Sequence, residues 1–67
     1  MRYSIEYLRE STDERSVFAT LAHGGPLADT MVLAVGGEAR GDLNADGCQV
    51  RDLDDGGRIV WLEHFNI

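Results

Sequence analysis

The sequence lacks most of the features that stabilise a small protein or direct it to a compartment. It contains no lysine and a single cysteine, Cys48, so no disulfide can form within the chain. A lone thiol fits a reducing compartment, so we expect an intracellular protein. The longest apolar run is MVLAV at 31–35, far below the ~20 residues of a membrane span. The first ten residues carry four charges, which argues against a secretory signal and favours the cytoplasm.

Positive charge is also scarce. Six arginines face twelve acidic residues, and the net charge is −6. We therefore expect no direct binding to nucleic acid, because that affinity comes from neutralising phosphates. An acidic surface either attracts a basic protein or only keeps the chain soluble. A length of 67 residues predicts one domain over 1–67, too small for the pocket that an enzyme needs.

The first third of the chain predicts a strand followed by a helix. Residues 1–8 alternate between apolar and polar side chains, which is typical of a strand with one buried face. Ser11 and Glu14 have the spacing of a capping box at a helix start. Apolar residues then follow at helical spacing up to Gly24, which predicts the C-terminal cap of the helix.

The middle of the chain predicts a second helix. Pro26 suits the first turn of a helix, and apolar residues recur at helical spacing over 26–40. The alternative is a strand at 30–35 that ends at two glycines.

The last third predicts a β-hairpin. CQVRDL and RIVWLEHF flank an Asp-Asp-Gly-Gly turn, and Asp55–Gly56 favours a type I′ loop. That loop would place Val50 opposite Trp61 and Asp52 opposite Ile59. The predicted fold is α+β in the order β-α-α-β-β, an antiparallel sheet with both helices on one face. We expect a core of Tyr3, Ile5, Tyr7, Phe18, Leu21, Met31, Val32, Val35, Val50, Ile59 and Trp61.

GDLNADG, residues 41–47, resembles the start of a dockerin or EF-hand calcium loop. The resemblance implies Asp42, Asn44 and Asp46 as ligands. The twelfth position of such a loop needs an acid, but Leu53 occupies it, and neither a following helix nor a second copy is predicted. We therefore expect no metal and no cofactor, with a degenerate calcium-binding module as an alternative. Asp and Asn also favour polar turns by bonding their own backbone.

No pattern in the sequence indicates a catalytic site. Cys48 is expected to face the core beside Val50, whereas His64 has the opposite parity and should point away. His23 is explained as a cation at a helix C-terminus. Two histidines and one cysteine lack the spacing of a zinc site, and we predict that the protein is not an enzyme.

The acidic residues gather in two parts of the chain. Asp52 and Asp54 are two residues apart, so on a strand they would stand about 6.6 Å apart, near the spacing of successive phosphates. Carboxylates also attract arginine as phosphates do, which suggests a nucleic-acid mimic. The predicted partner-binding residues are Glu10, Asp13 and Glu14 in one cluster, and Asp42, Asp46, Asp52, Asp54 and Asp55 in the other.

A short, acidic, cysteine-poor chain with this layout resembles the anti-CRISPR proteins of phages and mobile elements. Several of those proteins are acidic DNA mimics that block a Cascade surveillance complex. The resemblance covers the size, charge and element order of the whole chain. It implies an inhibitor in the host bacterial cell that binds a basic DNA- or RNA-binding surface, such as a Cascade subunit, and no membrane. The alternative is a small bacterial interaction or regulatory domain whose acidity serves solubility.

Overall fold

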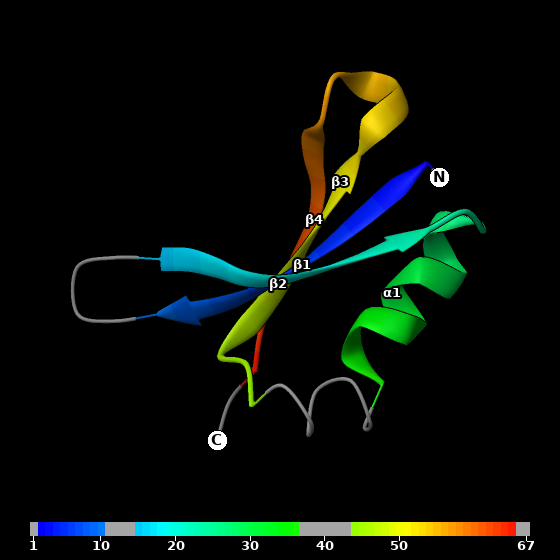
Figure 1. Ribbon diagram of the computed structural model, residues 1–67. Coiled ribbons are helices and arrows are strands. Elements are labelled where there is room, and N and C mark those ends of the chain that lie inside the picture. Colours follow the sequence, from blue (N-terminus) through cyan, green and yellow to red (C-terminus); the bar gives the residue numbers. More distant parts are fainter. Residues whose placement is uncertain (1, 11–14, 37–43, 66–67) are drawn as a thin grey trace.

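The computed structural model describes residues 2–10, 15–36 and 44–65. These residues form a four-stranded antiparallel sheet in the order β2-β1-β3-β4, with one helix against one face, so the fold is α+β (Figure 1). The elements are β1 (Tyr3–Glu10), β2 (Arg15–His23), α1 (Leu27–Val35), β3 (Gly47–Asp52), a short 3-10 helix η1 (Leu53–Asp55) and β4 (Arg58–His64). The predicted order β-α-α-β-β is wrong, because only one of its helices is present.

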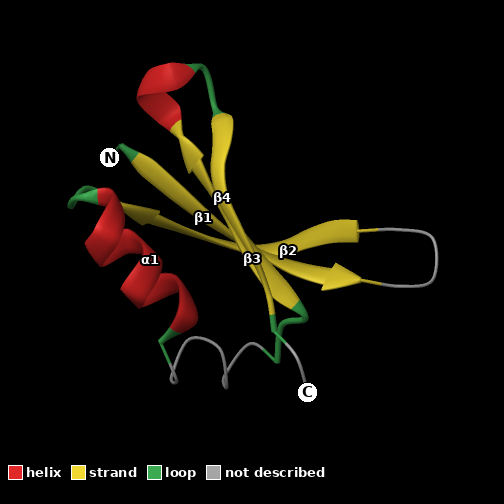
Figure 2. Ribbon diagram, turned by 180° about the vertical axis from the view of Figure 1, so that it is seen from behind, coloured by secondary structure: helices red, strands yellow, loops and turns green. Residues whose placement is uncertain are grey.

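Strand β1 forms where the alternation predicts it, and it lies between β2 and β3. Tyr3, Ile5 and Tyr7 are buried on the side of the sheet that faces α1, as predicted. Leu8 is also buried, on the opposite side, although its parity places it among polar neighbours. The two hairpins diverge because the sheet is strongly twisted (Figure 2).

Strand β2 occupies the segment in which a helix is predicted, and that prediction is wrong from Arg15 to His23. The proposed capping box at 11–14 lies outside the described residues. Val17, Phe18 and Thr20 are β-branched or aromatic, and such residues suit a pleated surface. Pairing with β1 along the full length of both strands overrides the helical spacing, with a bulge opposite the Tyr7–Leu8 step. The long hydrogen-bonded ladder with β1 therefore outweighs the helical spacing of the apolar residues in this segment.

The second predicted helix is confirmed in a shorter form, α1, and the alternative strand at 30–35 is wrong. Pro26 is the N-cap residue rather than part of the first turn. The helix ends at Gly36, whose N–H donates to the Leu33 carbonyl, and residues 37–40 lie outside the description. Within the described residues, no helix has the length and apolar character to cross a membrane.

The β3–β4 hairpin has the predicted register at its centre but not at its turn. Val50 lies opposite Trp61, as predicted. A bulge follows, so Asp52 lies opposite Arg58 instead of Ile59. The turn is not a two-residue type I′ loop: it consists of η1 followed by Gly56 and Gly57, both at positive φ (67° and 80°). Consecutive left-handed positions explain why two glycines stand there.

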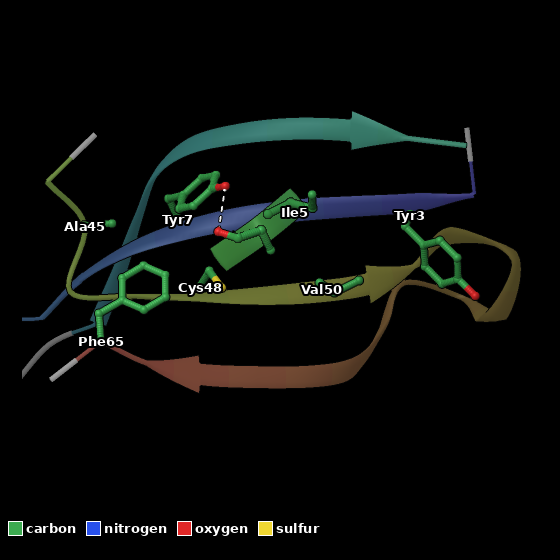
Figure 3. Packing of buried hydrophobic residues seen from close by; sticks show 8 residues of the cluster. Tyr3, Ile5, Tyr7, Ala45, Cys48, Val50 and Phe65 are labelled. Atoms are coloured by element: carbon green, nitrogen blue, oxygen red, sulfur yellow. Dashed lines mark hydrogen bonds between the residues drawn. The ribbon is translucent and has the colours of Figure 1, made fainter. Parts of the chain in front are cut away.

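The hydrophobic core lies between α1 and the sheet (Figure 3). The buried residues Tyr3, Ile5, Tyr7 and Val50 confirm the prediction, and Trp61 packs against them while partly buried. The prediction omitted Ala34, Ala45 and Phe65, which are buried. It was wrong for Phe18, Leu21, Val32, Val35 and Ile59, which are exposed, and Met31 is only partly buried. One helix of nine residues covers less of a four-stranded sheet than two helices would.

Candidate functional site

The hairpin tip contains three residues of the second predicted acidic cluster, Asp52, Asp54 and Asp55, and their environments differ. Asp52 is buried and accepts hydrogen bonds from Arg2 Nη2 at 3.1 Å and Nε at 3.3 Å. It also caps η1 by accepting from the Asp54 N–H at 3.0 Å. The hydrogen bond from Arg2 lowers the pKa of Asp52, and burial opposes that shift. The same contact raises the pKa of Arg2.

Asp54 and Asp55 remain exposed, with side chains 70% and 54% accessible. Asp55 pairs with Arg58 at 2.9 Å, and Arg2 Nε lies 3.9 Å from the Asp54 carboxylate. Asp54 belongs to η1 rather than to a strand, and Asp52 points inward. The predicted row of two carboxylates on one strand face is therefore wrong, and three aspartates share this tip with two arginines.

Asp46 and Glu10 connect three strands. The Asp46 carboxylate accepts from the Glu10 N–H at 2.8 Å, and its own N–H donates to the Leu8 carbonyl at 2.9 Å. The Phe65 N–H donates to the Asp46 carbonyl at 2.9 Å. The Glu10 carboxylate lies 3.3 Å from both Arg15 and His64. Both acids thus hold strand ends together. Asp13, Glu14 and Asp42 lie outside the described residues.

These contacts give the GDLNADG motif a structural explanation. Asn44 adopts the left-handed conformation at φ 52°, which Asn tolerates at turns. A Cβ on Gly47 would lie 2.6 Å from the Glu63 carbonyl oxygen, so this glycine permits close approach of β3 and β4. Among the residues that the structure describes, no three His, Cys, Asp or Glu side chains are grouped to hold a metal ion. Asp42 is not among them, so the absence of a metal stays a prediction.

The cysteine and both histidines have structural surroundings. Cys48 is buried beside Tyr7 and Val50, as predicted. His64 is exposed, as predicted, whereas His23 lies at the end of a strand and not of a helix. Its Nδ1 lies 2.6 Å from Thr30 Oγ1, and that hydroxyl donates to the Pro26 carbonyl. His23 therefore ties β2 to the first turn of α1.

The face of the sheet away from α1 is the largest feature that the sequence prediction missed. No described element covers it, and we call it the uncovered face. Strand pairing places on it Ser4, Glu6, Leu8 and Glu10 of β1, Arg15, Val17, Thr20 and Ala22 of β2, Gly47, Gln49 and Arg51 of β3, and Ile59, Leu62 and His64 of β4. The alternation of side chains within β1 and β3 could have identified the residues at the centre of this face. The residues that β2 and β4 contribute could not be identified in this way, because a bulge in each of these strands changes which side chains face outward.

A polar network forms the centre of the uncovered face. Glu6 Oε1 accepts from Gln49 Nε2 at 2.6 Å and from Arg51 Nε at 2.7 Å. Arg51 Nη1 donates to the Gly57 carbonyl at 2.9 Å. Gln49 is only 5% exposed, and the Glu6 side chain is 17% exposed. Arg51 neutralises Glu6 at the centre of this face, and Arg15 pairs with Glu10 at its end.

Apolar side chains surround this network. Val17, Ile59 and Leu62 are 45%, 44% and 38% exposed. The uncovered face is thus nearly neutral in a protein whose net charge is −6. Because the charges on this face are paired with each other, another protein can pack on its exposed apolar residues without burying an unpaired carboxylate.

Comparison with protein families, curated proteins and solved structures finds no match to this chain.

Proposed function

We propose that the chain is a small protein-binding domain that acts by covering a surface of a partner protein, without catalytic chemistry of its own. The observation that supports this proposal most is the near-neutral uncovered face, with its paired polar centre and exposed apolar side chains. The single cysteine, Cys48, is consistent with action in the reducing cytoplasm.

Binding at this face would use the paired centre for specificity and the apolar residues for affinity. The Glu6–Arg51 pair is already formed, so a partner need not bring a charge to compensate it. Val17, Ile59 and Leu62 would lose water-exposed apolar surface, at about 25 cal/mol per Å².

Lysine substitution tests this surface. Ile59→Lys and Leu62→Lys should each abolish stoichiometric capture of a protein from an extract of the producing cell. Val32→Lys is the control, because Val32 lies on α1 and is 70% exposed. Calorimetry with the purified partner should show the same order of affinities. Equal binding by all variants would contradict the proposed surface, and circular dichroism should show that each variant is folded.

A second proposed function is that of an acidic inhibitor of a nucleic-acid-binding protein, in the manner of the anti-CRISPR proteins that the chain resembles. The net charge and the exposed tip support it, since Asp54 and Asp55 protrude at the end of the β3–β4 hairpin (Figure 1). Asp52 is left out of this surface because Arg2 holds it. In this proposal the partner is a basic DNA- or RNA-binding surface, such as that of a Cascade subunit.

The two functions differ in their dependence on charge. The double variant Asp54→Lys/Asp55→Lys should lose competition with DNA for a Cascade-type complex, and salt should weaken the wild-type competition. Asp29→Lys/Glu63→Lys is the matched control, with the same change in net charge at exposed positions elsewhere. Equal loss in both double variants would show a general charge effect and exclude mimicry by the tip.

A further inference from the structure

Strands β2 and β4 are the two edges of the sheet, and neither contains a buried residue. On β2, the apolar residues Val17, Phe18 and Leu21 are 45%, 40% and 41% exposed. Its outer edge has no partner strand within the described part of the chain, because β2 is the first strand in the sheet order (Figures 1 and 2). An unpaired edge presents a row of N–H and C=O groups to any strand that can approach.

The opposite edge of the sheet, β4, differs from β2 by one carboxylate. Both strands begin at an exposed arginine and end at a histidine. Only β4 contains an acidic residue, the exposed Glu63, and a charged residue on an edge discourages pairing with another strand. Each edge strand has one bulge, so the bulges do not distinguish them. Of the two edges, only β2 is therefore free of acidic residues.

We propose that β2 pairs with β2 of a second copy of this chain, antiparallel about a two-fold axis, which joins two sheets into one. A net charge of −6 makes two copies repel each other unless they meet where acids are absent. β2 has no acidic residue, and the aspartates of the hairpin tip belong to the far side of the sheet order. An edge-to-edge contact of this kind is self-complementary, as a two-fold axis requires.

The length of the edge suits such an interface. Nine residues at about 3.3 Å each give an edge about 30 Å long. The longest dimension of the molecule is 32 Å, so the edge is about as long as the molecule. This pairing uses the outer edge of β2 and not the uncovered face, so it is independent of the function proposed above.

Two lysine variants with matched environments test the pairing. Val17 of β2 and Ile59 of β4 are β-branched, lie on the uncovered face and are 45% and 44% exposed. The wild-type chain should have twice the monomer mass by light scattering at about 1 mM. Val17→Lys should weaken the dimer about tenfold or more, because a lysine on an edge strand discourages pairing with another strand. Ile59→Lys should leave it unchanged.

Hydrogen exchange then identifies the paired strand. Amides of β2 should exchange more slowly as concentration rises, while those of β4 and α1 should not. A chain that stays monomeric at about 1 mM would overturn the proposal, as would a dimer that protects β4 or α1 instead. Protection of β2 only by a different protein would also overturn it.

If Val17→Lys is unfolded, Thr20→Lys replaces it, because Thr20 is exposed and polar. Loss of partner capture by Ile59→Lys with the dimer intact would support both proposals separately.

Discussion

The Asp52 carboxylate lies at the base of the β3–β4 turn, where it joins Arg2 to the first turn of η1. Because Arg2 lowers its pKa, the ionised form stabilises the fold at neutral pH. That contribution is present above the unfolded pKa of about 3.9 and is lost as pH falls through the lower folded value. Asp52 was predicted to bind a partner because it belongs to an acidic cluster, but its contacts give it a structural role.

Asp52→Asn should lower the melting temperature at pH 7, because the amide cannot form the ion pair with Arg2. The difference from the wild type should shrink below about pH 4, where Asp52 of the wild type becomes protonated. Thermal unfolding by circular dichroism at several pH values measures it. Asp54→Asn is the control, since Asp54 is exposed, and it should change the melting temperature little. A pH-independent difference would contradict this role.

Gly47→Ala should lower the free energy of unfolding by about 1–3 kcal/mol, the usual cost of overpacking. The added Cβ would lie 2.6 Å from a backbone oxygen of Glu63, which cannot move without opening the β3–β4 ladder. Urea denaturation with and without millimolar calcium measures the change. An unchanged stability would show that the strands separate easily, and dependence on calcium would favour the metal-loop interpretation of GDLNADG instead.

At the scale of elements, α1 is attached to the sheet by a few defined contacts. The Tyr7 hydroxyl donates to the Ala34 carbonyl at 3.0 Å, near the C-terminal end of the helix (Figure 3). His23 and Thr30 join the N-terminal turn to β2. Burial raises the pKa of Tyr7, with a further contribution from Cys48. The orientation of α1 therefore depends on polar contacts at both ends as well as on the core.

Tyr7→Phe should lower the free energy of unfolding by about 0.5–1.5 kcal/mol, the value of one hydrogen bond. Because the folded pKa of Tyr7 is raised, its contribution is full below the unfolded pKa of about 10 and decreases as pH rises above it. The variant should therefore lose part of the alkaline sensitivity of the wild type in urea titrations. Tyr3→Phe is the control, since Tyr3 is buried in the same core. Equal effects of both changes would contradict the importance of the helix contact.

At the scale of the whole molecule, the charge is unevenly distributed. The uncovered face and β2 are nearly neutral, whereas the hairpin tip contains three aspartates. A chain with six more acids than bases repels itself, and this repulsion opposes folding. Segregation of charge leaves two surfaces on which another protein can pack without burying an unpaired carboxylate.

Raising sodium chloride from about 10 mM to about 150 mM should raise the melting temperature, because the Debye length falls from about 30 Å to about 8 Å. We expect about 2–4 °C, which corresponds to about 0.5 kcal/mol in a domain of this size. Asp54→Asn/Asp55→Asn should show a smaller rise, since it has less charge to screen. A fall in melting temperature with salt would indicate that the ion pairs outweigh the repulsion.

Sequence pattern alone determined the elements whose signals are internal to them. The alternation in β1, the apolar run of α1 and the Val50–Trp61 pairing follow from periodicity and side-chain type. Net charge and the single cysteine likewise need no structure. In each case the signal lies within one element or one hairpin, and the contacts of the folded chain agree with it.

Tertiary structure alone decided the rest. Arg15–His23 forms a strand because it pairs with β1 along its full length. The spacing of apolar residues within the segment cannot reveal that pairing. Asp52 points inward because Arg2, fifty residues away in the sequence, pairs with it. The uncovered face depends on which side of the sheet α1 occupies. Charge and periodicity are local properties of a sequence, but burial and ion pairing depend on partners that only the folded chain brings together.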